Sequence, residues 1–540
     1  MGRGLIASQP IQEDELLFSV PRSILLNLHT SSLGRWCEAN EDEASPRKWE
    51  KVRAEGWAPL ILSLMWECWR SSAHGGAMWE RTKEMGLKRP AGLAGEEEER
   101  SVKWGPYFEI MPTDFDSPMM WAEDELKQLE GTDVMPRVGR AEADETYNTL
   151  IRPYILSHPT IFLGLPPTND SAAETDIEKY YSLAQFHLMG SRVLSRSFHV
   201  KDASKAEGGA ANKKAEGEGD DDESDDEDEE DEDEQEDTAD ISMVPLADML
   251  NARYASDNAR LFFHPSHLEM RSTSHISAGA QVFNTFGDPP NGDLLRRYGH
   301  VDEPNGADAV DLEAVLLGRA VCELTREKGA TVDEKEMEER VKWLCDSEQA
   351  VLDDAFPLTY LPNFPPSPSA PFRTTSSDTS PQELVSTLEE ALEEVGSLPE
   401  ELVQCARVLC LAREEFETQV KGKGKIPGPK LSAVHSRPDL GAQVELRASD
   451  LIVRALRIRL GTYPTSVEDD EEELSSMMDD GSQSQRRRRA ALVVRSGEKR
   501  VLWDHVRAFE AVGALAGEKK KRKVEGTGGG GEGVSKKVRQ

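Results

Sequence analysis

The stretch MVPLADMLNARYASDNARLFF (243–263) decides the fold. It begins as an apolar, strand-like run, places Asp248 and Asn251 directly after that run, and sets Asn258 before a second one. Buried Asp and Asn side chains need hydrogen-bond partners. The pattern therefore predicts one of two things, a polar turn closed by Asx hydrogen bonds or a ligand site at the ends of two strands.

A second stretch, GAQVFNTFGDPPNGDLLRRYGHV (279–301), predicts a strand, a turn and a short helix. It places Phe286 and Tyr298 twelve residues apart, each flanked by a glycine, and such aromatic residues either line a pocket or pack in a core. Near the start of the chain, the GRG sequence at 2–4 opens a strand. Its glycines permit a tight turn or a close approach of the backbone to a ligand.

The first 310 residues alternate between segments with strand patterns and segments with helical patterns. Strand patterns occupy 1–30 and 242–286, and helical patterns occupy 57–70, 121–155 and 174–197. The segment 202–240 contains no apolar residues able to form a core and is expected to be disordered. The sequence thus predicts an α+β fold in which short strands are interrupted by a helical insertion at about 50–197.

The sequence pattern of the remaining residues predicts an all-α domain. Apolar residues recur at three- and four-residue spacings in 310–328, 332–354, 381–395, 399–420 and 441–460. We expect a helical domain over 311–464, extending at most to about 515. Residues 465–490 are expected to be disordered, and 516–540 form a basic, Gly-rich tail.

The distribution of charge along the chain restricts the classes of molecule that the protein is expected to bind. The 540 residues carry a formal net charge of −37, and 19 of the acidic residues lie in 216–240. Direct binding to nucleic acid is disfavoured because phosphate contacts need a basic surface. No apolar run is long enough for a transmembrane helix, so no membrane association is expected. The six cysteines have no zinc-ligand spacing and are read as free thiols, and no metal site is predicted.

Two basic runs stand out near the end of the chain. KKKRKV (519–524) resembles a monopartite nuclear localisation signal, and the alternative is a solvated basic tail. RRRR (486–489) either contacts RNA or is simply solvated. The first run predicts a nuclear protein, with the cytoplasm as a second compartment, and a nuclear import receptor as partner.

Together, the GRG, VPLADMLNA and NTFGDPPNGDLLRRYGHV segments resemble the SET-domain family of protein-lysine methyltransferases. The resemblance is to the branch with a helical insertion. That branch includes plant Rubisco large-subunit methyltransferase, animal non-histone lysine methyltransferases and fungal ribosomal lysine methyltransferases, and the motifs are most similar to the fungal members. Residues 1–310 carry the resemblance, and 310–510 is similar in position to the family's substrate-binding domain.

The resemblance implies S-adenosyl-L-methionine as cofactor and assigns roles by motif position. Tyr298 matches the tyrosine of the family's YGF motif and is the expected catalytic residue. Arg196, in SRSF, matches an arginine that holds the cofactor's carboxylate. The residues expected to bind the cofactor are Gly2, Arg3, Gly4, Arg196, Asn251, Ala252 and Phe286. Those expected to border the substrate lysine are Trp104, Phe198 and Asp248.

Three departures from the family pattern bear on activity. Ala252 stands where the family has the histidine of an Asn-His pair. Phe286 stands where it usually has a tyrosine whose hydroxyl orients the target nitrogen. The family also has some tens of residues before the GRG sequence, so a truncated N-terminus is expected here.

These inferences lead to one expected function and two alternatives. The expected function is methylation of a lysine of a basic protein, specifically a large-subunit ribosomal protein. The first alternative is a catalytically weak SET-like protein that binds basic nuclear or ribosomal proteins, motivated by Ala252 and Phe286. The second is an acidic chaperone for basic proteins, which needs only the run 216–240.

Overall fold

The computed structural model describes residues 4–41, 47–84, 87–90, 104–164, 170–200, 241–330, 333–346, 352–361, 400–421, 442–478 and 480–527. The chain divides into two units. Unit 1 comprises Met1–Trp121, Val138–Asp288 and Arg296–Gly299, and unit 2 comprises Ala122–Arg137, Pro289–Leu295 and His300–Gln540.

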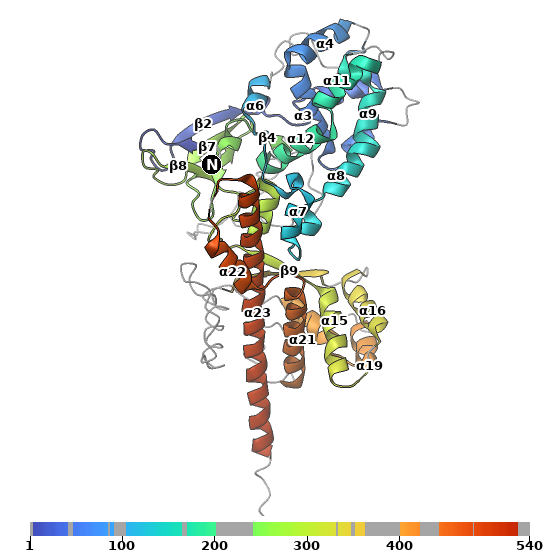
Figure 1. Cartoon of the computed structure of the whole chain (residues 1–540), viewed down its shortest axis with the longest axis vertical. Helices are drawn as coiled ribbons and strands as arrows, with labels where there is room; N and C mark the ends of the chain where they lie inside the picture. The colour runs from blue at the N-terminus through green and yellow to red at the C-terminus, as the bar shows by residue number, and fades with distance from the viewer. Residues whose placement is uncertain are drawn as a thin grey trace, which may run out of the picture. The chain divides into compact units, whose positions relative to one another are not determined.

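The helices of unit 1 gather apart from its strands β2, β7 and β8, around an apolar core of their own (Figure 1). They are α1 (Leu33–Asn40), α2 (Trp49–Arg53), α3 (Ala58–Ser71), α4 (Ala73–Glu84), α6 (Gly105–Ile110), α8 (Arg140–Thr146), η5 (Tyr147–Ile151), α9 (Arg152–Ser157), α10 (Pro159–Leu163), α11 (Asp170–Tyr180) and α12 (Leu183–Arg196), with the short turns η1 (Arg22–Ile24) and η2 (Pro118–Met120). The helix expected at 57–70 is α3. Its Pro59 lies in the first turn, where a missing N–H has no consequence, and Trp66 and Trp69 are fully buried.

The long helix expected over 174–197 is instead two helices that break at Tyr181 and Ser182. The Ser182 hydroxyl caps α12 by accepting a hydrogen bond from the Gln185 N–H at 3.4 Å. The Tyr147 hydroxyl donates to the Tyr181 carbonyl at 2.6 Å. At the break, the Ser182 side chain and the Tyr147 hydroxyl therefore form hydrogen bonds with backbone groups that would have paired with each other in a continuous helix.

The strands of unit 1 pack around a second core of small and branched side chains. β2 (Leu16–Pro21), β7 (His267–Ser272) and β6 (Ala259–Phe263) form an antiparallel sheet in the order β2-β7-β6. β1 (Leu5–Ile6), β8 (Gln281–Asn284) and β5 (Asn251–Ala252) form a second sheet with β8 in the centre, and β3 (Ser197–His199) pairs with β4 (Ile241–Met243). Buried and partly exposed residues alternate along β7, as expected of a strand with one face on a core.

Unit 2 is a helical unit with one small sheet. Its elements are α7 (Glu123–Leu126), η3 (Lys127–Leu129), η4 (Met135–Arg137), α14 (Asn291–Asp293), β9 (Ala309–Glu313), α15 (Ala314–Glu327), α16 (Glu334–Asp346), β10 (Ala355–Thr359), α18 (Glu400–Leu409), α19 (Arg413–Glu415), η10 (Phe416–Lys421), α21 (Ala442–Leu460), α22 (Val467–Ser476) and α23 (Gln483–Thr527). The α+β class and the helical C-terminal region are confirmed. The structure adds the antiparallel pair β9–β10, in which Val310, Leu312, Phe356 and Leu358 face the core.

Residues 465–490 differ from the sequence prediction, because they hold α22 and the start of α23. Most of their charged residues are exposed, but Asp470 and Arg487 are buried and paired with opposite charges. Asp470 is 1% exposed and accepts hydrogen bonds from Arg495 Nη2 and Lys499 Nζ, both at 2.6 Å. Composition suggested a solvated segment, whereas pairing between opposite charges allows it to fold.

Two further segments differ from their expected places. Ala122–Arg137, expected within the helical insertion, belongs to unit 2, where Asp133 Oδ1 accepts a hydrogen bond from Arg459 Nη2 at 2.7 Å. α23 continues to Thr527, into the segment expected as a tail, since its Lys, Glu, Ala and Arg residues favour helix. The expectations for 202–240 and 381–395 lie outside the described residues. None of the described helices combines the length and the hydrophobicity needed to cross a bilayer.

The buried Asp308 of unit 2 should make the stability of the folded protein depend on pH. Its carboxylate accepts hydrogen bonds from the Asn291 backbone N–H at 2.8 Å and from Asn291 Nδ2 at 3.2 Å. Burial nevertheless raises the pKa of Asp308 to about 7. The folded protein therefore holds this proton more tightly than the unfolded chain does. The stability that the protonated form contributes is full at acidic pH and is lost as the pH rises through about 7.

We expect the Asp308→Asn variant to lose part of this pH dependence, because its side chain cannot ionise. Urea unfolding of both proteins between about pH 5 and about pH 8 measures it. The free energy of unfolding should fall with rising pH more steeply for the unmodified protein than for the variant. Parallel pH profiles would show that Asp308 is ionised throughout.

Candidate active site

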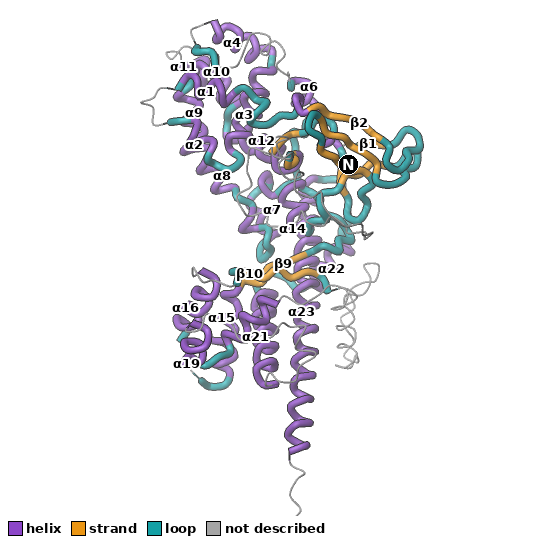
Figure 2. The backbone as a smooth tube through the Cα atoms, turned by 180° about the vertical axis from the view of Figure 1, so that it is seen from behind, coloured by secondary structure: helices purple, strands orange, loops and turns teal. Residues whose placement is uncertain are grey.

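The central strand β8 brings three distant parts of the chain together. β1 runs antiparallel to it, with Leu5 opposite Val282, and β5 runs parallel to it, with Asn251 opposite Phe283 and Ala252 opposite Asn284. The start of the chain, the VPLADMLNA segment and the NTF segment thus meet in one sheet. Figure 2 shows β1 and β2 among the strands on one side of unit 1.

Gly4 packs closely against two polar side chains. A Cβ atom at this position would lie 2.7 Å from Asn251 Nδ2 and 2.3 Å from Gln281 Nε2. Real Cβ atoms do not approach other heavy atoms so closely, so any larger residue would push these side chains away. The structure therefore brings Gly4 and Asn251 together. Gly2 and Arg3 lie outside the described residues.

The turn before β5 is strained. Leu246 has φ 76° and ψ −46°, close to the rare γ-turn whose central residue has positive φ, and its side chain is exposed. Such a conformation costs a branched residue about 1–3 kcal/mol and persists where the surrounding structure imposes it. The turn leads into η8 (Ala247–Met249), which carries Asp248 and holds its side chain inside the protein.

Asp248 is the centre of a buried polar group with Arg196 and Tyr107. The Tyr107 hydroxyl donates to Asp248 Oδ2 at 2.9 Å. Arg196 Nη1 donates to the Asp248 carbonyl at 2.5 Å and lies 3.3 Å from Oδ2. Burial raises the pKa of Asp248, and the Arg196 charge opposes that rise. Burial and the Asp248 carboxyl raise the pKa of Tyr107 well above its usual value, so its hydroxyl stays protonated and donates.

Two atoms of this group have no hydrogen-bond partner among the described residues. They are Arg196 Nε, a donor, and Asp248 Oδ1, an acceptor, and both are buried. Buried polar atoms are normally paired, so each unpaired one needs an explanation. The unpaired donor and acceptor are chemically complementary to a negative group and to a hydrogen-bond donor, respectively.

Phe286 and Tyr298 form a stacked aromatic pair. Their ring centroids are 4.1 Å apart and their planes differ by 7°. Phe286 follows β8 by two residues, and Tyr298 is the last residue of the π-helical turn η9 (Leu294–Tyr298). The structure thus brings these two predicted residues together just beyond the end of the central strand.

Gly299 fixes the backbone beside Tyr298. It has φ 74°, and a Cβ atom there would lie 2.7 Å from the Ser117 backbone nitrogen and 2.8 Å from the Asp116 carbonyl carbon. We expect Gly299→Ala to lower stability by about 1–3 kcal/mol, because backbone atoms cannot give way as a flexible side chain can. Thermal unfolding measures the effect.

Gly279→Ala is the matched control for that substitution. Gly279 also has a positive φ, 82°, but no atom lies within 4 Å of a Cβ built there. The Gly279→Ala variant therefore measures only the cost of holding an alanine at positive φ. Equal losses of stability in the two variants would show that the contact with residues 116 and 117 has no effect.

The remaining predicted residues are placed as follows. Trp104 caps α6 and is buried in the helical core, where its indole N–H donates to the Ile24 carbonyl at 3.2 Å. Phe198 lies on β3 opposite Ser242 and packs on the strand core. Their contact with a substrate stays a prediction, as do the ligand contacts of the other predicted residues.

Sequence reasoning missed Tyr107 and Leu246 and left Asn258 undecided. Tyr107 stands in the WGPYF segment three residues after Trp104, but its partner Asp248 is 141 residues away. Asn258 is structural, because its side chain donates to the Gln281 carbonyl at 3.1 Å and accepts from the Phe283 N–H at 2.8 Å. The Asn258 side chain therefore links its loop to β8 and does not close a local Asx turn, whereas Asp248 retains an unpaired buried atom.

Sequence comparison finds relatives over most of the chain. It is 26% identical over 431 residues to N-lysine methyltransferase setd6 of Xenopus laevis, covering 78% of this chain and 70% of that protein. It is 26% identical over 422 residues to human N-lysine methyltransferase SETD6, covering 77% and 65%. It is 26% identical over 308 residues to Ribosomal lysine N-methyltransferase 4 of Saccharomyces cerevisiae, covering 56% and 49%.

A domain family and solved structures agree with these relatives. Residues 333–502 match the family described as Rubisco LSMT substrate-binding. The SET domain of LSMT bound to lysine and AdoHcy superposes with a TM-score of 0.52 at 18% identity, covering 98% of this chain and 90% of that one. Rubisco LSMT bound to AdoMet gives 0.50 at 17% identity, with the same coverage. The chain thus has the fold of these SET-domain structures and is similar in sequence over most of its length to protein-lysine methyltransferases.

Proposed function

We propose that this protein is an S-adenosyl-L-methionine-dependent protein-lysine N-methyltransferase. One observation supports the proposal most strongly: Asp248, just before β5, pairs with the partly buried Arg196, and each side chain has a buried atom without a hydrogen-bond partner among the described residues. There, Asn251 meets the glycine loop at the start of the chain. The relatives' names support the same reaction class.

The residues at this site fit the cofactor. Arg196 Nε is an unpaired donor suited to the cofactor's carboxylate, and the closely packed Gly4 allows the backbone to lie against a bound molecule. Asn251 and Ala252 on β5 border the same sheet. When bound, S-adenosyl-L-methionine supplies a methyl group already activated on a sulfonium, so no acid is needed to expel the leaving group.

The protein must present the substrate lysine as a neutral amine. A free lysine side chain has a pKa of roughly 10.4, and neutralising it at pH 7 costs about 4.6 kcal/mol. An apolar environment lowers that cost by disfavouring the ammonium form. The stacked Phe286 and Tyr298 rings offer such a surface, and the Tyr298 hydroxyl would orient the nitrogen lone pair. Asp248 Oδ1 remains available to accept a hydrogen bond from the arriving amine.

We extend the proposal to the substrate class, a basic protein and specifically one of the large ribosomal subunit. The yeast relative is named a ribosomal lysine methyltransferase, which supports this choice. The acidic run at 216–240 would attract such a partner electrostatically.

We also propose nuclear import through KKKRKV (519–524), a run that lies within the bounds of α23. Replacing its five basic residues with alanine should remove a fluorescent fusion from the nucleus. An unchanged distribution would contradict this part of the proposal.

The decisive test of the cofactor site is Arg196→Met, which keeps an unbranched apolar stem and removes the guanidinium charge. A charged hydrogen bond contributes about 1.5–3 kcal/mol, so calorimetry should show about 10- to 100-fold weaker S-adenosyl-L-methionine binding. Arg152→Met, in the same unit and exposed on α9, is the matched control and should bind normally. Equal affinity in all three proteins would contradict the placement of the cofactor.

A second candidate function remains, a SET-like protein that binds basic proteins without efficient catalysis. Phe286 and Ala252 favour it, because the family usually has a tyrosine and a histidine there. Incubation with radiolabelled cofactor and large-subunit ribosomal proteins separates the two functions. Cofactor binding without any label transfer supports the binding protein, and label on a ribosomal lysine supports the enzyme.

A further inference from the structure

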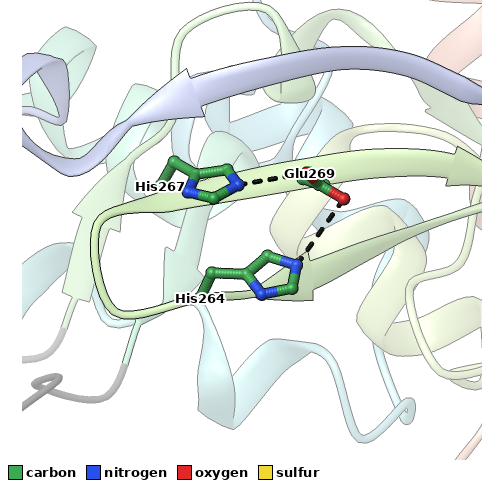
Figure 3. A group of neighbouring side chains, drawn as sticks. All are labelled: His264, His267 and Glu269. Carbon is green, nitrogen blue, oxygen red and sulfur yellow. Dashed lines mark hydrogen bonds and ion pairs between the residues drawn. The ribbon is translucent and has the colours of Figure 1, made fainter.

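A group of two histidines and one glutamate lies at the tip of the β6–β7 hairpin. His264 follows β6, while His267 and Glu269 stand on the same face of β7, and all three side chains point toward one another (Figure 3). His267 Nε2 lies 3.1 Å from Glu269 Oε1, and His264 Nε2 lies 3.6 Å from Glu269 Oε2. None of the three belongs to the candidate active site.

The spacing of these atoms suits a tetrahedral metal ion. Zinc binds imidazole nitrogen and carboxylate oxygen at roughly 2.0–2.2 Å, which places neighbouring ligand atoms about 3.3 Å apart. The two His–Glu distances, 3.1 Å to Oε1 and 3.6 Å to Oε2, are close to this value although they end on different carboxylate oxygens, and one ligand atom from each residue lies within 4.8 Å of the others. Because a metal ion lies in the plane of each imidazole that binds it, the half-exposed His264 ring would have to turn out of its stack with His267 to complete the set.

Backbone hydrogen bonds hold the hairpin in this arrangement. The His264 N–H donates to the His267 carbonyl at 2.9 Å. Arg22 Nε donates to the His264 carbonyl at 2.8 Å, and the Arg22 N–H donates to the Ser266 carbonyl at 3.1 Å. The two imidazole rings are stacked, with centroids 4.8 Å apart and planes 16° from parallel. A ligand set on a rigid turn binds without a large loss of entropy.

Side chains that bind a metal usually form further hydrogen bonds with their neighbours, and the neighbours of His267 and Glu269 provide such bonds. Without a metal, His267 Nε2–H donates to Glu269 Oε1; with a metal on Nε2, the ring would carry its proton on Nδ1 and could donate it to Ser266 Oγ, 3.0 Å away. Arg271 Nε donates to Glu269 Oε2 at 2.8 Å and leaves Oε1 for another partner. The hydrogen bonds from His267 and Arg271 lower the pKa of Glu269, which keeps it in the charged form that binds cations.

Either protons or a cation can hold these three groups together. If both stacked rings were protonated, two like charges would face each other at short range. Neutral rings can instead donate from Nε2, as His267 does to Glu269 Oε1, or turn their Nε2 lone pairs toward a cation. A divalent ion satisfies both lone pairs and the carboxylate at once.

We propose that His264, His267 and Glu269 bind a zinc ion, with a fourth position open to water. Two imidazoles and one carboxylate are a ligand set that zinc accepts readily. Because the unfolded chain does not hold the three ligands together, the ion would stabilise unit 1 by linking the turn to β7.

The test is a zinc titration of the full-length protein after treatment with a chelator. Calorimetry should show one ion bound per chain at this site. His264→Ala, His267→Ala and Glu269→Gln should each weaken binding at least about tenfold, since even outer contacts of a metal matter by that factor. His275→Ala, which removes an exposed histidine from the loop after β7, is the matched control and should bind as the unmodified protein does.

Thermal unfolding provides a second readout. Added zinc should raise the melting temperature of the unmodified protein and of His275→Ala, and should leave that of His267→Ala unchanged. Equal zinc affinity in all five proteins would place the ion elsewhere and overturn the proposal. Absence of saturable binding to the unmodified protein would overturn it too, leaving the three side chains as a simple ion-pair group.

Discussion

Tyr298→Phe should lower turnover by about 100- to 1,000-fold, because it removes one hydroxyl aimed at the reacting amine. The phenylalanine ring retains the stack on Phe286, whose centroid lies 4.1 Å from that of Tyr298. Shape and apolar surface are therefore preserved, and affinity for S-adenosyl-L-methionine should change by less than about threefold. The effect should appear in the rate constant of methyl transfer rather than in cofactor binding.

Single-turnover kinetics with radiolabelled cofactor, together with calorimetry, measure the two quantities separately. Tyr180→Phe makes the same chemical change in the helical core of unit 1, away from the site, and should alter neither quantity. Equal losses of rate and cofactor affinity in Tyr298→Phe would contradict the role assigned to the hydroxyl. An unchanged rate would remove Tyr298 from the catalytic machinery altogether.

Asp470→Ala should destabilise unit 2 by about 3–5 kcal/mol, since it leaves two buried cations without their counter-ion. The Asp470 carboxylate binds Arg495 and Lys499 at 2.6 Å each, and the side chains of these two partners are only 5% and 2% exposed. Lys499 also donates to the Thr465 hydroxyl and to the Ser466 carbonyl. These contacts cannot replace a negative charge.

Urea unfolding followed by circular dichroism gives the change in stability, and hydrogen exchange of peptides from α22 and α23 locates it. The control is Glu472→Ala, which removes an exposed carboxylate from the same helix and should change stability by less than about 0.5 kcal/mol. If Asp470→Ala were equally mild, water or rearranged side chains would have to solvate both cations.

The sequence predicted the parts of the fold that depend on local patterns. The helix at 57–70 was visible because its apolar residues fill a whole helical length. The apolar run before Asp248 was predicted to be a strand, but β4 ends at Met243, Asp248 lies in η8 and Asn251 begins β5. The meeting of Gly4 with Asn251 could be expected only through the family resemblance. No local signal links residues that lie so far apart in the sequence.

The predictions that failed concern residues whose partners are remote. Tyr107 looks like an ordinary aromatic residue until Asp248 is placed beside its hydroxyl. Residues 465–490 have the composition of a disordered, solvent-exposed segment. Composition gives the number of charged residues but does not show which of them pair in the interior. Propensity also could not detect β9, since its strand character depends on β10, more than forty residues later in the chain.

The pairing of β1 and β2 with β8 and β7 has a consequence during protein synthesis. β2 ends at Pro21 and β8 at Asn284, so the first two strands leave the ribosome long before their partners exist. With about 260 residues between them and synthesis at about 5–20 residues per second, the wait is roughly 13–50 s. During that time the nascent chain exposes unpaired strand edges, while the helices of residues 49–196 can already assemble. Chaperone demand should therefore peak just before residue 284 emerges, and it should fall once the sheet around β8 closes.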